Sequence, residues 1–153
     1  MDSELDELQQ RLQEMIIADA RKAYSDKVID HAMNPRNVGE IRDADGYGSA
    51  LGICGDSMEV WLRVRDDAIA DARFWTDGCA TTIASGSVIT ELVKGRTVVE
   101  ALNLAAKDVL AALDGLPADS EHCANLAANA LHQAIEDYLT RKREPWKKPY
   151  RQC

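Results

Sequence analysis

Two periodicities of apolar and polar residues divide the chain. Between residues 57 and 76 the two classes alternate, whereas the flanking segments carry apolar residues at intervals of three or four. Strict alternation predicts half-buried β-strands, and the longer interval predicts amphipathic helices. We therefore expect strands in the middle of the chain and helices on either side of them.

The clearest strand pattern predicts a hairpin. In "SMEVWLRVRDD", residues 57–67, apolar residues occupy every second position: Met58, Val60, Leu62 and Val64. Asp66 and Asp67 predict a turn, after which "AIADARFWTDG" alternates again and completes a hairpin with one buried face. A third strand near "GYGSALGICG", residues 46–55, makes a three-stranded antiparallel sheet, although its glycines weaken the strand pattern.

The helical segments complete the expected fold. Residues 1–23 predict an amphipathic helix whose apolar positions are Leu5, Leu8, Leu12, Met15 and Ile16. "YSDKVIDHAMNPRNVG", residues 24–39, predicts a short helix. Later helices are expected over 80–95 and over 98–113, and Asp119 or Ser120 is expected to cap a long last helix. Strands followed by helices predict a single α+β domain, a three-stranded antiparallel sheet packed against several helices, with an extra N-terminal helix.

Composition and charge narrow the function. The chain has 153 residues, 46% hydrophobic and 29% charged, as in ordinary globular proteins. No segment approaches the roughly 20 apolar residues that cross a bilayer, and the acidic N-terminus lacks a signal-peptide core. We therefore expect a cytoplasmic protein without a membrane partner. The net charge of −8 argues against nucleic-acid binding, and only residues 141–153 are basic.

Three cysteines are candidates for a functional site. Cys54, Cys79 and Cys123 are 25 and 44 residues apart, spacings that match neither a CxxC redox motif nor a paired zinc knuckle. Each lies at the boundary of an expected element, and two lie at helix N-termini, where free N–H groups favour the thiolate. A lone cysteine is commonly a small buried apolar residue, but such a residue should lie within an apolar face. We interpret the three as one site, to which Cys153 in the tail is not expected to contribute.

Three thiolates leave a tetrahedral metal ion one ligand short. The carboxylate of Asp56 and the imidazole of His122 are the two candidates for the fourth donor. Three thiolates with one oxygen or nitrogen donor bind less firmly than four thiolates, so the site suits temporary binding of iron and sulfur. His31 and His132 fall on expected helices and are interpreted as surface or packing residues.

The cysteine blocks resemble those of a known family, the iron–sulfur cluster assembly scaffolds of the IscU type, equivalent to the N-terminal domain of NifU. "YSDKVIDHAMNPRNVG" is similar to the opening of that family. "CGD" at 54–56, "DARFWTDGCATTIASGS" at 71–87 and "HC" at 122–123 match its three cysteine blocks in order and spacing. The resemblance spans residues 24–143, which we treat as a scaffold domain between an N-terminal helical extension, 1–23, and a basic tail, 144–153.

The resemblance implies a ligand set and a function. Cys54, Asp56, Cys79 and Cys123, with His122, form the assembly site. A cysteine desulfurase that uses pyridoxal phosphate supplies sulfur as a persulfide, iron enters the site, and an electron donor reduces the sulfur. The resulting 2Fe–2S cluster passes to apo iron–sulfur proteins or carrier proteins. Cys123 is the implied persulfide acceptor, zinc occupies the same ligands when iron is absent, and the protein is a scaffold and not an enzyme.

Two segments depart from the family pattern. Bacterial members served by a dedicated DnaK-type chaperone carry Leu-Pro-Pro-Val-Lys before His-Cys, whereas this chain has "LPADS" at 116–120, with Ser120 in place of the lysine. We therefore do not expect chaperone-driven release. The helix at 1–23 is an addition to the family domain, and its apolar stripe suggests a homodimer.

Two other functions compete with the scaffold. A zinc-dependent sulfur-acceptor and transfer partner of a cysteine desulfurase, related in fold, usually inserts an extra segment between the second and third cysteine blocks. The stretch from Cys79 to Cys123 shows no such insertion. A structural zinc domain is the third candidate, which the thiols at helix starts and the neighbouring Asp56 disfavour. The scaffold is the preferred hypothesis.

Overall fold

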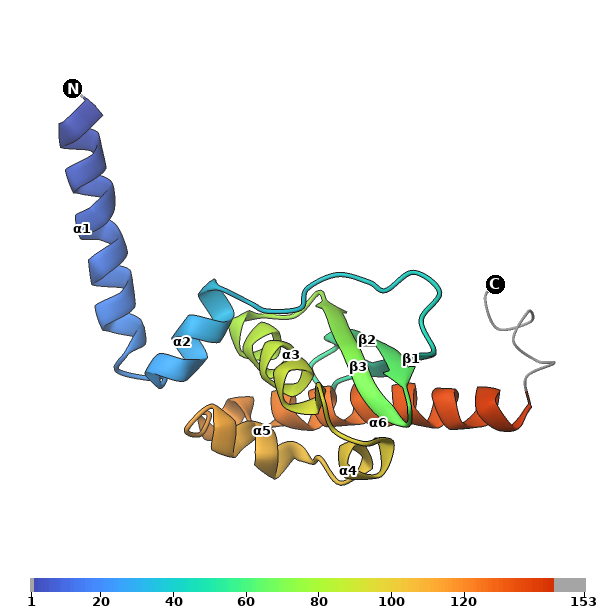
Figure 1. The fold of residues 1–153 in the computed structure, drawn as a ribbon. Helices are drawn as coiled ribbons and strands as arrows, with labels where there is room; N and C mark the ends of the chain where they lie inside the picture. Colours follow the sequence, from blue (N-terminus) through green and yellow to red (C-terminus); the bar gives the residue numbers. More distant parts are fainter. Residues whose placement is uncertain (1, 145–153) are drawn as a thin grey trace.

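A three-stranded antiparallel sheet and a long last helix form the centre of the molecule (Figure 1). The computed structural model describes residues 2–144, so most of the expected tail, with Cys153, lies outside the described residues. The elements in chain order are α1 (Asp2–Ala20), α2 (Asp26–Met33), β1 (Gly46–Leu51), β2 (Ser57–Arg65), β3 (Ala68–Thr76), α3 (Ala80–Val93), α4 (Val98–Leu102), α5 (Ala106–Ala112), the 3₁₀ turn η1 (Ala118–Ser120) and α6 (His122–Arg143). The predicted α+β fold is confirmed.

The sheet keeps the predicted alternation. Its strand order is β1-β2-β3, and both neighbouring pairs are antiparallel. Met58, Val60 and Leu62 of β2 are fully buried, whereas the residues between them are partly exposed. Asp66 and Asp67 connect β2 to β3 with φ angles of +52° and +59°. Positive φ at both positions gives a type I′ turn, whose twist suits a two-residue hairpin.

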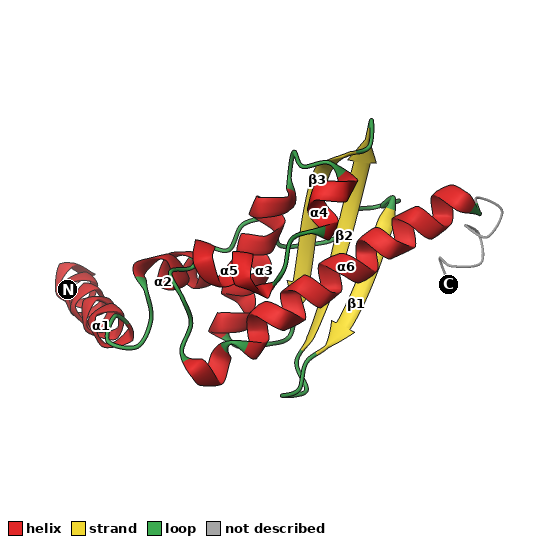
Figure 2. Ribbon diagram, turned by 90° about the horizontal axis from the view of Figure 1, so that it is seen from below, coloured by secondary structure: helices red, strands yellow, loops and turns green. Residues whose placement is uncertain are grey.

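Two glycines allow α6 to cross β1 closely (Figure 2). A Cβ atom on Gly48 would lie 2.3 Å from the backbone nitrogen of Ala134, and one on Gly46 would lie 2.4 Å from the Ala134 carbonyl oxygen. A larger residue at either position would therefore push the helix off the sheet. The glycines that weaken the strand pattern in the sequence are the residues that let the helix and the sheet pack.

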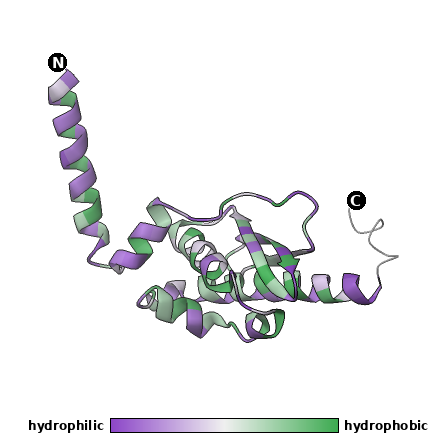
Figure 3. Ribbon diagram, in the orientation of Figure 1, coloured by the Kyte–Doolittle hydropathy of each residue, from purple (hydrophilic) through white to green (hydrophobic). Residues whose placement is uncertain are grey.

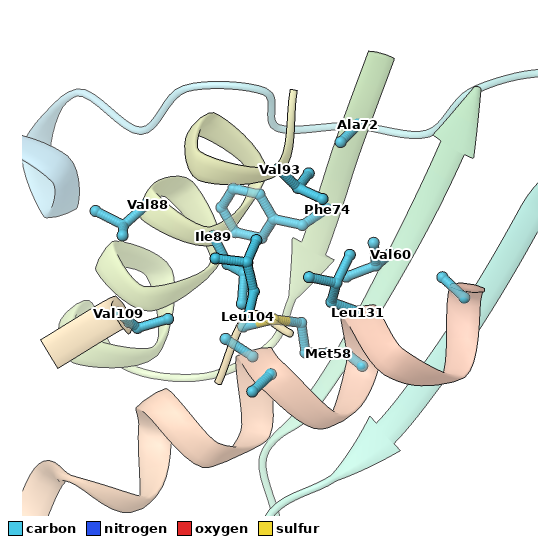
Figure 4. Close-up of a cluster of buried hydrophobic side chains, with 14 of the residues drawn as sticks. Met58, Val60, Ala72, Phe74, Val88, Ile89, Val93, Leu104, Val109 and Leu131 are labelled. Carbon is cyan, nitrogen blue, oxygen red and sulfur yellow. The ribbon is translucent and has the colours of Figure 1, made fainter. Parts of the chain in front are cut away.

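The hydrophobic core lies where α3 and α6 meet the sheet (Figure 4). Phe74 of β3, Ile89 of α3 and Leu131 of α6 are all buried and come together there. Gly86 of α3 allows this contact, because a Cβ atom on it would lie 2.4 Å from the Phe74 ring. Burial of these side chains stabilises the packing of α3 and α6 against the sheet.

The segment 98–113 differs from the prediction because it forms two helices. The Thr97 hydroxyl accepts a hydrogen bond from the Glu100 N–H at 3.1 Å and caps α4, which ends at Leu102. The Asp108 carboxylate accepts the Ala105 N–H at 2.9 Å and opens α5 as a separate helix. A second cap three residues after α4 therefore competes with continuation of one helix.

The last helix begins later than expected. Asp119 and Ser120 lie in η1, where the Ser120 N–H donates to the carbonyl oxygen of Pro117 at 2.8 Å. Neither residue therefore caps α6, and the prediction that one of them does so is wrong. The later start places His122 and Cys123 in the first turn of α6.

The predicted N-terminal helix is present and stands away from the domain (Figure 1). None of its residues is buried, and its large apolar side chains are exposed: Leu5, Leu8, Leu12, Met15 and Ile16. Its C-terminal end lines an apolar pocket together with α2 and the start of α3. Among the described residues, no helix combines the length and the apolarity needed to cross a bilayer.

Candidate functional site

One loop and two helix starts meet at one end of the sheet and bring the three cysteines together. Cys54 lies on the loop between β1 and β2, Cys79 is the N-cap residue of α3, and Cys123 is the second residue of α6. The strand register pairs Leu51 with Ser57, and Met58 with Thr76. The β1–β2 loop and the junction between β3 and α3 therefore lie at the same end of the sheet.

The β1–β2 loop is held by backbone and side-chain hydrogen bonds. The Gly52 N–H donates to the carbonyl oxygen of Asp56 at 2.7 Å, and the Gly55 N–H donates to the Gly52 carbonyl at 3.1 Å. Gly55 has a φ of +85°, which favours glycine. Asp77 Oδ1 accepts the Ser57 N–H at 2.8 Å. These bonds tie the loop to the segment before α3 and hold its candidate ligands beside that helix.

His122 joins two of the cysteines. Its Nε2 atom lies 3.1 Å from Sγ of Cys54 and 3.7 Å from Sγ of Cys123. One imidazole nitrogen therefore bridges a sulfur on the β1–β2 loop and a sulfur on α6. This places one of the two candidates for the fourth donor in direct contact with two thiols.

Two threonine hydroxyls bridge the other pair of cysteines. Thr81 Oγ1 lies 3.1 Å from Sγ of Cys79 and 3.4 Å from Sγ of Cys123. Thr82 Oγ1 lies 3.7 Å and 3.4 Å from the same two sulfurs. Both threonines are buried in the first turn of α3. Polar atoms therefore fill the space between these two sulfurs.

Asp56 reaches the site through Thr82. The Thr82 hydroxyl donates a hydrogen bond to Oδ2 of Asp56 at 3.1 Å. Gly78 permits this approach, because a Cβ atom on it would lie 2.8 Å from that oxygen and 2.7 Å from Cβ of Thr82. One hydroxyl group therefore links the candidate oxygen donor to Cys79 and Cys123.

The three cysteines differ in exposure. Cys54 and Cys79 are exposed, whereas Cys123 is only 1% exposed. Two threonines and His122 contact the Cys123 sulfur and separate it from solvent. An incoming reagent therefore meets Cys54 and Cys79 first, and it reaches Cys123 only after a neighbouring side chain moves.

The surroundings of Cys79 make its thiol acidic. Partial burial by itself would raise the pKa of Cys79, but hydrogen bonds from the Thr81 hydroxyl and from the backbone N–H groups of Thr81 and Thr82 outweigh it and lower the pKa to about 7. The positive end of the α3 helix dipole acts in the same direction. A large share of Cys79 is therefore thiolate at neutral pH, which is the form that binds metal and attacks sulfur.

All five predicted site residues belong to this connected group. Thr82 joins Asp56 and Cys79 to Cys123, and His122 joins Cys54 to Cys123. Within residues 2–144, no three His, Cys, Asp or Glu side chains are grouped closely enough to hold a metal ion as they stand. The hydroxyls and the imidazole lie between the sulfurs, so shared coordination of an ion requires side chains to rotate.

The other two histidines lie apart from the cysteines. His31 Nδ1 is 2.7 Å from Oγ of Ser87, and His132 Nε2 is 2.6 Å from the carbonyl oxygen of Leu104. Both rings are half-buried and hydrogen-bonded within the fold. Their interpretation as packing residues agrees with these contacts.

Sequence reasoning missed Thr81, Thr82 and Gly78. The available signal is the segment "GCATT", in which a glycine precedes a helix N-cap and two hydroxyl residues follow in the first turn. The segment alone does not reveal their contacts, because Asp56 and Cys123 come from distant parts of the chain.

Residues 23–145 match the sequence model of the NifU-like N-terminal domain. The chain is 52% identical over 117 residues to iron-sulfur cluster assembly scaffold protein IscU 1 of Archaeoglobus fulgidus, over 76% of each protein. It is 44% identical over 125 residues to iron-sulfur cluster assembly scaffold protein IscU of Escherichia coli K12, over 78% of this chain and 97% of that protein. Its fold is similar to the crystal structure of a NifU-like protein (N-terminal) from Brucella abortus, with a TM-score of 0.61 and 21% identity, over 76% of this chain and 94% of that one. This chain therefore belongs to the NifU-like N-terminal domain family, as its cysteine blocks predict.

Proposed function

We propose that this protein is a scaffold on which an iron–sulfur cluster is built and from which the cluster passes to other proteins. The observation that carries the proposal is the connected group of three cysteines, Asp56 and His122 at one end of the sheet. Cysteine thiolates are the usual ligands of such clusters. The relatives from Archaeoglobus fulgidus and Escherichia coli are both named as iron-sulfur cluster assembly scaffold proteins.

The donor set favours temporary binding. Three thiolates provide affinity for iron, and a single oxygen or nitrogen donor exchanges more readily than a fourth thiolate. His122 contacts two sulfurs directly, whereas Asp56 reaches two sulfurs through Thr82. Both remain candidates for the fourth ligand in this proposal. Cys54 is exposed. In this proposal, iron enters the site and the finished cluster leaves it past this residue.

Sulfur arrives, in this proposal, as a persulfide on a cysteine desulfurase. The Cys123 thiolate attacks the terminal sulfur of that persulfide, a new S–S bond forms on Cys123, and the desulfurase thiolate leaves. Two electrons from an electron donor then reduce the bound sulfur to sulfide and restore the Cys123 thiolate. Because Cys123 is buried, the transfer requires His122 or Thr81 to move aside.

The cluster is cargo and not a permanent part of the protein. We propose a 2Fe–2S cluster that passes to apo iron–sulfur proteins or to carrier proteins. Zinc shares the thiolate preference of iron, so it occupies the same ligands when iron is absent. The "LPADS" segment lacks the motif for a dedicated DnaK-type chaperone, so release in this proposal does not depend on one.

We also propose that two copies of the chain pair through α1. Figure 3 shows hydrophobic residues spaced among hydrophilic ones along this helix. The exposed apolar residues Leu5, Leu8, Leu12 and Met15 are three or four positions apart, which is the spacing of a coiled-coil seam. Most of the stability of helices in proteins comes from packing of an amphipathic face, and the apolar stripe of α1 is exposed in the single chain. Pairing with α1 of a second copy would bury the exposed stripe.

Anaerobic reconstitution tests the scaffold function. The reduced protein is incubated with ferrous iron, L-cysteine, a reductant and a cysteine desulfurase. We expect visible absorption from a thiolate-ligated cluster and an amount of acid-labile sulfide that matches it. We also expect the cluster to pass to an apo-ferredoxin. A zinc-dependent sulfur-transfer protein would instead stimulate the desulfurase through bound zinc and form no transferable cluster. A structural zinc domain would do neither and would unfold on chelation. Either of these two results would overturn the scaffold proposal.

A further inference from the structure

The Thr82 hydroxyl contacts three of the five candidate ligands at once. Its oxygen lies 3.1 Å from Oδ2 of Asp56, 3.4 Å from Sγ of Cys123 and 3.7 Å from Sγ of Cys79. Its neighbour Thr81 also contacts the two sulfurs. Thr82 differs from Thr81 because its hydroxyl also contacts the Asp56 carboxylate. Its position therefore couples the oxygen donor to the sulfur donors.

We propose that Thr82 is a positioning residue that orients Asp56 for metal binding, an inference that rests on the proposed function. A threonine hydroxyl has one proton, and Thr82 donates it to Asp56, so it donates no hydrogen bond to either sulfur. The bond fixes Oδ2 and leaves the other carboxylate oxygen for an incoming ion. Outer-shell hydrogen bonds of this kind orient metal-binding carboxylates and raise metal affinity.

The two partners differ in how firmly they are held. Thr82 is fully buried in the first turn of α3, and its β-branched side chain has restricted χ1 rotation. Asp56 lies on the β1–β2 loop and is only partly buried. Gly78 leaves the space in which the two meet. The helix therefore supplies a fixed hydroxyl to which the carboxylate of a loop is attached.

Three single substitutions separate the hydroxyl from the rest of the side chain. Thr82→Val keeps the shape and removes the hydroxyl, and we expect metal affinity to fall by about 10-fold or more, within the about 10–100-fold range typical of outer-shell changes. Thr82→Ser keeps the hydroxyl and should retain the wild-type affinity. Thr90→Val is the matched control, because Thr90 is also buried on α3 but donates to helix carbonyls, including that of Gly86. It should leave the affinity unchanged.

Cobalt gives a readout that does not depend on cluster assembly. Co²⁺ is titrated into the reduced full-length chain without oxygen, in competition with a chelator of known affinity, and the thiolate-to-cobalt absorption band reports binding at the cysteines. The decisive comparison is a double-mutant cycle between Thr82→Val and Asp56→Ala. If Thr82 acts through Asp56, Thr82→Val has no further effect once Asp56 is replaced. An equal loss in both backgrounds means that Thr82 acts by packing or through sulfur alone, and it overturns the proposal.

Thermal unfolding of each metal-free variant controls for loss of structure. If Thr82→Val is unfolded at the assay temperature, Thr82→Ala removes the same hydroxyl with less bulk and replaces it in the cycle. Unchanged cobalt affinity in a folded variant that lacks the hydroxyl also overturns the proposal. A wild-type chain that binds cobalt but assembles no cluster overturns the scaffold function and leaves the role of Thr82 intact. A wild-type chain that binds no cobalt through its thiolates overturns both.

Discussion

The imidazole of His122 lies against the thiol of Cys54, with Nε2 3.1 Å from Sγ, although the two residues are 68 positions apart. The same nitrogen lies 3.7 Å from the sulfur of Cys123, the next residue in the chain. The ring therefore covers a buried thiol and connects it to an exposed one. We therefore expect the His122 side chain to slow the access of reagents to Cys123.

The first prediction concerns the order in which the thiols react. In the metal-free protein, iodoacetamide should modify Cys54 and Cys79 before Cys123, because Cys123 is buried. His122→Ala should speed modification of Cys123 by about fivefold, the factor that corresponds to about 1 kcal/mol for one hydrogen bond. Mass spectrometry of peptides from timed samples measures each rate. Equal rates for all three thiols in the wild-type protein would contradict the buried position of Cys123.

The second prediction concerns the ligands of the cluster. Replacing Cys54, Cys79 or Cys123 singly with Ser should abolish cluster assembly, because a serine hydroxyl is a poor ligand for iron beside soft thiolates. Visible absorption and acid-labile sulfide after anaerobic reconstitution measure the result. Cys153→Ser is the control and should assemble as much cluster as the wild-type protein. A full cluster on any of the three site variants would remove that cysteine from the ligand set.

The third prediction concerns Asp56. The variant Asp56→Ala should assemble a cluster and pass it to an apo-ferredoxin several-fold more slowly, because it lacks the readily exchanged oxygen donor. Transfer is followed by the change in visible circular dichroism as the ferredoxin acquires its cluster. Asp119→Ala, which removes an exposed carboxylate from η1, should transfer at the wild-type rate. Faster loss of the cluster from Asp56→Ala than from the wild-type protein would show that its assigned role is wrong.

The fourth prediction concerns pH. Hydrogen bonds from the Thr81 hydroxyl and from the backbone N–H groups of Thr81 and Thr82 outweigh the effect of burial and lower the pKa of Cys79 to about 7, so its alkylation rate should rise with pH and reach half its maximum near pH 7. The lowered pKa means that the thiolate stabilises the fold above the ordinary thiol pKa of about 8.5, and that this stabilisation is lost as pH falls through about 7. Thr81→Val should move the alkylation midpoint upward. A midpoint near that of an ordinary thiol in the wild-type protein would show that these hydrogen bonds do not form in solution.

The fifth prediction concerns the homodimer. Light scattering after size exclusion should give the wild-type protein twice the 16.9 kDa mass of one chain. Replacing Leu8 and Leu12 together with Glu should return it to the mass of one chain, because charges in a coiled-coil seam oppose pairing. Gln9→Glu adds a charge beside the stripe and should leave the dimer intact. A wild-type protein that has the mass of one chain at micromolar concentration would overturn pairing through α1.

Local patterns were sufficient for most of the fold. The alternation around Met58, Val60 and Leu62 identifies β2 because a side chain on every second position faces the same side of a sheet. The division of 98–113 into α4 and α5 was not predictable in this way. It depends on the hydrogen bond from the Ala105 N–H to Asp108, which competes with continuation of one helix.

Only part of the candidate site could be predicted from the sequence. The cysteines stood out because each lies at an element boundary beside Gly, Asp or His, where an apolar filler is not expected. Thr82 did not stand out, because a threonine in the first turn of a helix is ordinary. Its significance comes from contact with Asp56 and Cys123, which the packing of the helices against the sheet brings to it.

The sequence by itself determined most of the elements, their order and the choice of Cys54, Cys79 and Cys123 as candidate sulfur ligands, because periodicity and chemical type are properties of neighbouring residues. The tertiary structure alone decided that Cys123 is buried while Cys54 is exposed, and that hydroxyls and an imidazole lie between the sulfurs. These features are distances between residues far apart in the chain. They are set by the crossing of α6 over β1 at Gly46 and Gly48 and by the packing of α3 on Phe74, which no local pattern encodes.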